Sequence, residues 1–324
     1  MLKVAITGVN GFLGSNLLKG CLEKGYDVRG LVRSGARTTL LPDNFEPTVV
    51  NYWDSKDIER VLSGQEILIH NAGITRGKDW GEFDRKNVEM TAKILQVVNH
   101  IDSIKQVIFI SSQAAAGMCK GKRGKLEVDE CTPITYYGKS KLLAEREIMA
   151  NCSKNWTIIR PASVFGAGDR DFLQYFKLVK HKLALLVGFK DKYVSLIYIN
   201  DLVDLIIKTI GNEEAYEEIF FASSEKSYSW DEFIDALEKA TDKKTVRIRV
   251  PEFLVYPIAL FGELKGLFCG RPALINLQKA KEIVGDYWIC DSSKAKQLLN
   301  FDTEEELSDK LKATYLWYKE HKWL

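Results

Sequence analysis

The sequence has few cysteines and histidines, and they do not cluster. Its six cysteines include no Cys-x-x-Cys pair, and its four histidines are dispersed along the 324 residues. Disulfide frameworks and zinc sites need paired or clustered ligands. The pattern therefore argues against both, and it predicts a protein without a metal in a reducing, cytoplasmic compartment.

The sequence also has no large excess of one charge and no long apolar run. The 46 basic and 44 acidic residues leave a net charge of +2, whereas a nucleic-acid partner calls for a one-sided basic excess. The most apolar stretch, 253–268, is interrupted by Gly262, Glu263, Lys265 and Gly266 and is shorter than the roughly 20 residues of a membrane span. We interpret it as a buried or amphipathic helix, with contact to a membrane surface as the alternative. A strand-like start leaves no room for a signal peptide, so we expect a partner among small molecules, no nucleic acid and no membrane span.

The sequence does contain a regular alternation of apolar runs and helical segments. The runs lie at 2–6, 26–32, 48–51, 67–70, 107–110 and 156–159, with helical spacing at 58–62 and 88–98 between them. Strands that alternate with helices predict a parallel sheet covered on both faces. The expected fold class is therefore α/β, a doubly wound parallel (Rossmann) sheet.

Beyond Gly166 the alternation becomes irregular. The spacing predicts helices at 172–181, 202–210 and 230–241, and strands at 194–198, 219–222 and 246–250. We interpret residues 1–165 as a dinucleotide-binding domain that also receives elements from 193–222. Residues 166–192 and 223–324 then form a smaller, interleaved C-terminal lobe that binds the substrate.

Three glycines, Gly8, Gly11 and Gly14, lie between the first strand and the first helix. Without a Cβ they permit positive φ and allow a pyrophosphate to approach the backbone, and a helix N-terminus offers free N–H groups. The turn predicts a dinucleotide site; taken alone, an ordinary turn with incidental glycines is the alternative.

The second strand ends at Arg33, where an NAD-binding fold usually carries an acid for the ribose 2′-hydroxyl. A guanidinium there forms charge-assisted bonds to a 2′-phosphate, and Arg37 could reach the same group. We therefore favour NADP over NAD as cofactor, with two solvated arginines as the alternative. Asp54, after the third strand, is interpreted as lining the adenine pocket or as a helix N-cap.

A candidate catalytic group combines Ser112, after the fifth strand, with Tyr137 and Lys141. If 137–148 is helical, Tyr137 and Lys141 lie one turn apart on one face. A neighbouring ammonium would lower the pKa of the phenol from its usual value near 10. Tyr-x-x-x-Lys also occurs at 52/56, 315/319 and 318/322, but only the pair at 137/141 follows a strand ending in Ser-Ser.

Together these features resemble the extended short-chain dehydrogenases/reductases of the NAD-dependent epimerase/dehydratase superfamily. The matching segments are Thr7-Gly8-x-x-Gly11-Phe12-Leu13-Gly14, His70-Asn71-Ala72-Gly73, Asn87-Val88, Ser111-Ser112, Tyr137-Gly138-Lys139-Ser140-Lys141, Arg160-Pro161 to Phe165-Gly166, and Asp291-x-Ser293-Lys294-Ala295.

The resemblance implies a role for each site residue. Tyr137 would be the catalytic acid/base, Lys141 would bind the nicotinamide ribose and lower the pKa of Tyr137, and Ser112 would polarise the reacting oxygen. The other cofactor-binding positions would be Thr7, Gly8, Gly11, Phe12, Leu13, Gly14, Asn71, Ala72, Gly73, Pro161 and Val164. Asn87 would have a structural role. Members of the family frequently dimerise through helices beside the tyrosine, so a homodimer is compatible with the resemblance.

The branch of the family is less well marked. Many nucleotide-sugar epimerases have Asn where this chain has Ser163, and a tyrosine where it has Ala116. Arg33 is more like the dihydroflavonol-reductase branch. The sequence thus favours an NADP-dependent oxidoreductase with net hydride transfer between cofactor and a carbonyl or alcohol. The alternatives are a nucleotide-sugar epimerase or dehydratase that recycles its bound cofactor, and a non-enzymatic dinucleotide sensor, against which Ser112, Tyr137 and Lys141 argue.

Overall fold

Seven parallel strands form the main sheet of this computed structural model, which describes residues 1–269, 276–303 and 306–324. The strands are β1 (Lys3–Thr7), β2 (Asp27–Val32), β3 (Thr48–Val49), β4 (Ile67–His70), β5 (Gln106–Ile110), β6 (Asn155–Pro161) and β10 (Glu218–Ala222). Their order is β10-β6-β5-β4-β1-β2-β3, and every pair is parallel. The predicted doubly wound α/β fold is confirmed. Because the chain order reverses between β1 and β4, ligands are expected above their carboxyl ends.

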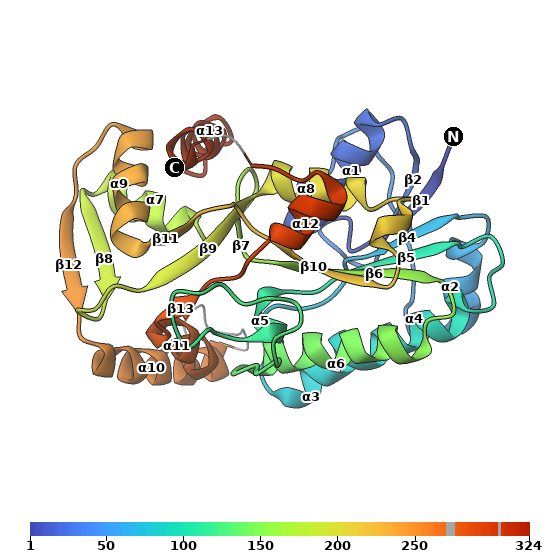
Figure 1. The fold of residues 1–324 in the computed structure, drawn as a ribbon, viewed down its shortest axis with the longest axis horizontal. Coiled ribbons are helices and arrows are strands. Elements are labelled where there is room, and N and C mark those ends of the chain that lie inside the picture. Colours follow the sequence, from blue (N-terminus) through green and yellow to red (C-terminus); the bar gives the residue numbers. More distant parts are fainter. Residues whose placement is uncertain (270–275, 304–305) are drawn as a thin grey trace.

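Helices cover both faces of this sheet (Figure 1). One face packs against α1 (Phe12–Glu23), α8 (Ile199–Lys208) and α12 (Ser293–Leu299). The other packs against α2 (Ser55–Leu62), α4 (Met90–Val98) and α6 (Tyr136–Asn151). The central strands are rich in apolar residues because both faces of the sheet are covered; in β4, for example, all four residues are buried and three are apolar.

Short helices connect some of these elements. A turn of helix, α3 (Trp80–Phe83), runs into a π-helical segment, η1 (Asp84–Glu89), which continues into α4. The sequence predicted helical character at 88–98, which the structure divides between η1 and α4. A second short helix, α5 (Gln113–Ala116), begins at the end of β5, and a 3₁₀ turn, η2 (Glu213–Ala215), precedes β10.

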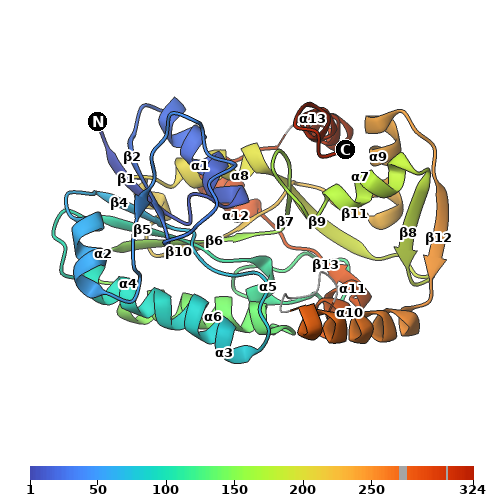
Figure 2. The ribbon, with the colours of Figure 1, turned by 180° about the vertical axis from the view of Figure 1, so that it is seen from behind.

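The remaining elements build the smaller lobe (Figure 2). One sheet contains β7 (Ser163–Phe165), β9 (Tyr193–Tyr198), β11 (Ser227–Ser229) and β13 (Tyr287–Trp288), and a second pairs β8 (Leu183–Val187) with β12 (Val246–Val250). The helices are α7 (Leu173–Lys180), α9 (Trp230–Thr241), η3 (Glu252–Leu254), α10 (Val255–Cys269), α11 (Leu277–Val284) and α13 (Leu307–Glu320). Its core is largely aromatic, with Phe165, Phe176 and Phe233 fully buried.

The segment 193–222 is divided between the two sheets. Its first strand, β9, is central to the smaller lobe, whereas α8 and β10 belong to the main one. A later piece, α12, also returns to the main sheet and packs near α8 and β10. The interleaving therefore extends further along the chain than the interval 193–222.

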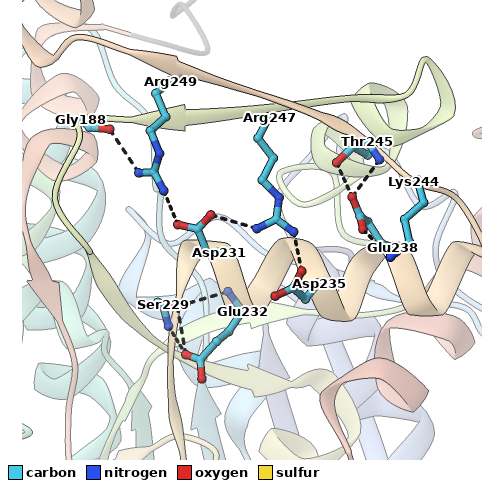
Figure 3. A network of polar contacts seen from close by, with 10 residues as sticks. All are labelled: Gly188, Ser229, Asp231, Glu232, Asp235, Glu238, Lys244, Thr245, Arg247 and Arg249. Carbon is cyan, nitrogen blue, oxygen red and sulfur yellow. Dashed lines mark hydrogen bonds and ion pairs between the residues drawn. The ribbon is translucent and has the colours of Figure 1, made fainter.

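Ion pairs join β12 to α9 in the smaller lobe (Figure 3). Arg247 binds Asp231 at 3.0 Å and also binds Asp235, while Arg249 binds Asp231 at 2.6 Å. Arg249 also donates to the carbonyl of Gly188 at 3.5 Å. These side chains are about one-third exposed except for Asp235, so each pair contributes little stability alone, about 1 kcal/mol or less. The network orients the turn at Gly188 that follows β8.

Candidate active site

The glycine turn after β1 is tightly packed against its own backbone. Gly8 has a φ of +68°, and a Cβ there would lie 2.9 Å from the Cα of Ala72. A Cβ at Gly14 would lie 2.2 Å from the carbonyl oxygen of Gly8. Gly11 is the N-cap of α1 and offers no side chain to its first N–H groups. These N–H groups suit an anionic pyrophosphate, so the turn fits the dinucleotide predicted from the sequence.

The loop after β4 lies against this turn. Thr7 Oγ1 accepts the backbone N–H groups of Asn71 at 3.0 Å and Ala72 at 2.9 Å, and Asn71 Nδ2 donates to the Gly8 carbonyl at 3.3 Å. The structure thereby brings the predicted positions Thr7, Gly8, Asn71 and Ala72 together at the switch point of the sheet. Leu13 packs against the core, and Phe12 is partly buried.

The hydrogen bonds around buried His70 have a defined direction. Because Thr7 Oγ1 already accepts two N–H groups, its own proton goes to His70 Nδ1 at 2.9 Å. His70 Nε2 then donates to Thr91 Oγ1 at 2.9 Å, and Thr91 donates to the Asn87 carbonyl at 2.7 Å. Burial, and secondarily the charge of Lys141, lower the pKa of His70 to about 3. His70 is therefore a neutral structural link between β1, β4 and η1.

Asn87 extends this series of hydrogen bonds to α6, the helix that carries Tyr137. Its amide accepts from Ile74 N at 2.8 Å and donates to Ile74 O at 3.0 Å and to Ser140 Oγ at 2.8 Å. Ser140 donates in turn to the carbonyl of Tyr137 at 2.8 Å. In this structure Asn87 bonds the loop after β4 and α6, where it holds the two in register.

Tyr137 and Ser112 lie together where α6 begins. Thr135 caps this helix by accepting the N–H of Gly138 at 3.1 Å, and Ser112 caps α5 by accepting the N–H of Ala114 at 3.1 Å. The Ser112 hydroxyl also hydrogen-bonds the Tyr137 side chain. The pKa of Tyr137 is nevertheless raised to about 12, because desolvation outweighs the Ser112 hydrogen bond and the carboxylate of Glu282 adds to it.

The expected lowering of the Tyr137 pKa by Lys141 is therefore wrong for the protein alone. Burial lowers the pKa of Lys141 itself to about 8, opposed by the charge of Glu145. Its ammonium lies 4.3 Å from the centre of the Phe109 ring and 4.0 Å from the position a Cβ would take at Gly73. A buried ammonium with no hydrogen bond to the described residues is a suitable partner for ribose hydroxyls.

An ion pair behind this site was not identified from the sequence. Arg160, at the end of β6, binds both oxygens of Glu145 at 3.0 and 2.7 Å, and both side chains are 2% exposed or less. Ser111, beside Ser112, donates to the same carboxylate. Glu145 follows Lys141 by one helical turn, so the i, i+4 spacing on the catalytic face was the available signal. The pair fixes α6 relative to β5 and β6.

The remaining predicted positions lie on other elements of the fold. Arg33 and Arg37 are exposed after β2, and Asn10 in the glycine turn donates to the Arg37 carbonyl at 3.0 Å. Asp54 is exposed and caps α2 through the N–H of Lys56 at 3.0 Å, while its contact with adenine stays a prediction. Pro161 ends β6, and Val164 in β7 pairs with Ile197.

A cavity of about 1080 Å³ lies between the segment before α6 and the smaller lobe, and none of Ser112, Tyr137 and Lys141 lines it. Its lining includes Met118, Ile134, Phe189, Phe253, Tyr256 and Val284. Ile134 lies three residues before Tyr137, and Glu282, two residues before Val284, accepts a hydrogen bond from the Thr135 hydroxyl at 3.4 Å.

Among the described residues no group of histidine, cysteine or carboxylate side chains could hold a metal. No helix formed by these residues is long and apolar enough to cross a membrane.

Comparison with known proteins agrees with this geometry. A model of the NAD dependent epimerase/dehydratase family matches residues 4–222. The chain belongs to this family. It is therefore an enzyme of the extended short-chain dehydrogenase/reductase type, with the NAD(P) nucleotide cofactor typical of the family.

The proteins similar to this chain include enzymes with different activities. A UDP-glucose 4-epimerase of Vibrio cholerae is 32% identical over 81% of this chain and 82% of its own length. A ceramide reductase of Caulobacter vibrioides is 23% identical over 99% of this chain and 96% of its own. The structure of a Bacillus cereus UDP-glucuronic acid 4-epimerase, in complex with UDP-glucuronic acid and NAD, aligns with a TM-score of 0.78 at 21% identity, covering 99% and 100% of the chains.

Replacing Lys141 by methionine is expected to stabilise the protein at neutral pH. The pKa of Lys141 is about 8 in the folded protein and about 10.5 for an ordinary lysine, so between these values the unfolded chain binds more protons. The free-energy cost of burying the protonated Lys141 in the folded protein is therefore complete below pH 8. This cost is lost as the pH rises towards 10.5. Thermal unfolding at pH 7 and pH 10 checks this: Lys141→Met should unfold several degrees higher than wild type at pH 7 only. An equal difference at both pH values would contradict it.

Proposed function

We propose that this enzyme epimerises a hydroxyl-bearing carbon of a nucleotide sugar and recycles its bound cofactor. The observation that carries the proposal is the extended similarity to the Vibrio cholerae UDP-glucose 4-epimerase. The cavity lined by Ile134, three residues before Tyr137, supports it because most of the lining residues come from the smaller lobe, as expected for a substrate site in this fold. The preference for net hydride transfer drawn from the sequence is thereby reversed.

The proposed chemistry assigns one proton and one hydride. Tyr137 as phenolate takes the proton from the substrate hydroxyl while the hydride on the same carbon leaves, which gives a ketone. Hydride return to the opposite face, with the proton given back by Tyr137, yields the epimer and leaves no net redox change. When bound, an oxidised nicotinamide would accept this hydride and give it back, and its positive charge would lower the pKa of the Tyr137 phenol. Ser112 donates to the reacting oxygen, and Lys141 holds the cofactor ribose.

The proposal is tested by incubating the purified protein with UDP-glucose and related nucleotide sugars. We expect epimer formation, detected by chromatography or NMR, without a change in absorbance at the wavelength of reduced nicotinamide. Cofactor released by denaturing the purified protein would support recycling. Net oxidation of added NADPH in the presence of a ketone or aldehyde, without epimer formation, would overturn it.

A second candidate is an NADPH-dependent carbonyl reductase of the dihydroflavonol-reductase branch. It is favoured by Arg33, which has no acidic partner among the described residues, and by the ceramide reductase, whose similarity extends over nearly the whole chain. A panel of aldehydes and ketones with NADPH separates the candidates, because only the reductase consumes the cofactor in proportion to product.

For cofactor choice we expect NADPH to bind more tightly than NADH. Exposed Arg33 and Arg37 follow β2, where charge-assisted bonds to a 2′-phosphate contribute about 1.5–3 kcal/mol. The variant Arg33→Ser/Arg37→Ser should lose about tenfold or more in NADPH affinity and little in NADH affinity. Arg146→Ser, an exposed arginine on α6, serves as the control. Equal affinities of the wild-type protein in a fluorescence titration would refute the assignment.

A further inference from the structure

Helix α10 exposes an unusually apolar surface. From Phe253 to Gly262 the only polar side-chain atom is the hydroxyl of Tyr256. Only Val255 and Ala259 of this stretch are buried, in a small cluster with α11. Ile258 is 54% exposed and Phe261 73% exposed. Most of the apolar side chains from Phe253 to Phe261 therefore lie in contact with solvent.

The exposed apolar surface extends beyond the helix. At about 100° per residue, positions 256, 258, 260 and 261 span more than half of the circumference of α10. The helix lies along the outer edge of the smaller lobe in both views (Figures 1 and 2). Phe253 and, in the turn after β8, Phe189 are 69% and 73% exposed and line the same cavity. We call Phe189, Phe253, Leu254, Tyr256, Ile258, Leu260 and Phe261 the apolar face.

The charges beside the apolar face are arranged unequally. Lys190 and Lys281 line the cavity opening, are exposed, and make no ion pair with the described residues. The carboxylates of Glu252 and Asp286 on the same rim both bind the ammonium of Lys192 at 2.9 Å. The cationic groups are thus available to an external anion, whereas these two carboxylates already have a partner.

We propose that the apolar face docks on the surface of an anionic phospholipid bilayer, with α10 lying in the plane of the interface. A bilayer can contact exposed side chains over more than half of the circumference of α10, whereas a second copy packed helix to helix would cover one flank. Lys190 and Lys281 then face lipid phosphates. Phe189, Phe253 and Tyr256 belong to the apolar face and also line the cavity. Docking of the apolar face therefore brings the cavity opening to the headgroup region.

The test is flotation of the full-length protein with vesicles of phosphatidylcholine containing phosphatidylglycerol. We expect wild type to float with the vesicles, and the variant Ile258→Gln/Phe261→Gln to bind at least about tenfold more weakly. Neither residue lines the cavity, so cofactor binding and the unfolding midpoint should match wild type. The control Leu316→Gln/Val246→Gln changes side chains that are 54% and 64% exposed on other surfaces, and it should bind as wild type does.

Three results would overturn the proposal. Wild type could fail to float with these vesicles, or the Ile258→Gln/Phe261→Gln variant could float as well as wild type. Sedimentation velocity without lipid gives the third: a wild-type dimer that this variant dissociates would show that a second copy covers the apolar face. The outcome is independent of the epimerase assay, which uses water-soluble substrates.

Discussion

Tyr137→Phe is expected to lower turnover by about 10³-fold or more, because it removes the proton that the reaction transfers and leaves the ring in place. The ring of Tyr137 packs near Phe83, with 6.5 Å between ring centres, and a phenylalanine keeps this contact. Cofactor affinity should stay close to that of wild type, since Lys141 and the glycine turn are unchanged. Turnover of whichever substrate the wild-type enzyme converts is the measurement.

The chain offers a matched control for this substitution. Tyr136 precedes Tyr137 on the same helix and is 41% exposed, with its ring 6.0 Å from that of Trp80. Tyr136→Phe should therefore leave turnover within a factor of about two. Full activity of Tyr137→Phe would remove Tyr137 from the mechanism, whichever reaction the enzyme catalyses.

Glu145→Ala is expected to lower the free energy of unfolding by about 3–5 kcal/mol, because it leaves the charge of Arg160 buried without its carboxylate. The pKa of Arg160 is raised: desolvation opposes its charge, but the hydrogen bonds and charge of Glu145 outweigh it. Ser111 loses its acceptor in the same variant. Urea denaturation followed by circular dichroism measures the change.

Two further variants define this effect. Asp204→Ala removes the carboxylate of an exposed pair with Lys208, 3.8 Å apart, and should cost about 1 kcal/mol or less. Glu145→Leu/Arg160→Met removes both buried charges, and it should recover much of the stability lost in Glu145→Ala. If Glu145→Ala is no more destabilising than Asp204→Ala, the buried pair does not anchor α6.

Local sequence patterns predicted the main sheet well because its strands and turns are determined by residues close together in the sequence. The run before Gly8 is a strand because it is apolar on both faces, and the glycines allow the turn into α1. The predicted α9 at 230–241 and β12 at 246–250 agree with the structure. Short elements such as β7, β8 and β13 were not identified, since two to five residues become a strand only through partners distant in the sequence.

In the candidate active site, too, local patterns could not predict contacts between residues distant in the sequence. Tyr137 and Lys141 are one turn apart on a helix, so spacing alone placed them together. The direction of the Tyr137 pKa could not be obtained in this way, because desolvation and the charge of Glu282 depend on how the smaller lobe closes over α6. Arg160 was noted only as part of a motif, since its partner Glu145 lies 15 residues away on another element.

The sequence by itself determined the α/β class, the glycine turn and the placement of Tyr137 and Lys141 one turn apart on a helix, because these depend on residues within a few positions of one another. Only the tertiary structure decided the buried Glu145 and Arg160 pair, the neutral His70 link and the raised pKa of Tyr137. It also left most apolar side chains at 253–261 exposed, where the sequence allowed a buried or an amphipathic helix. Burial is the reason for this division: it depends on which segments meet in space, and it sets both the cost of a charge and the exposure of an apolar side chain.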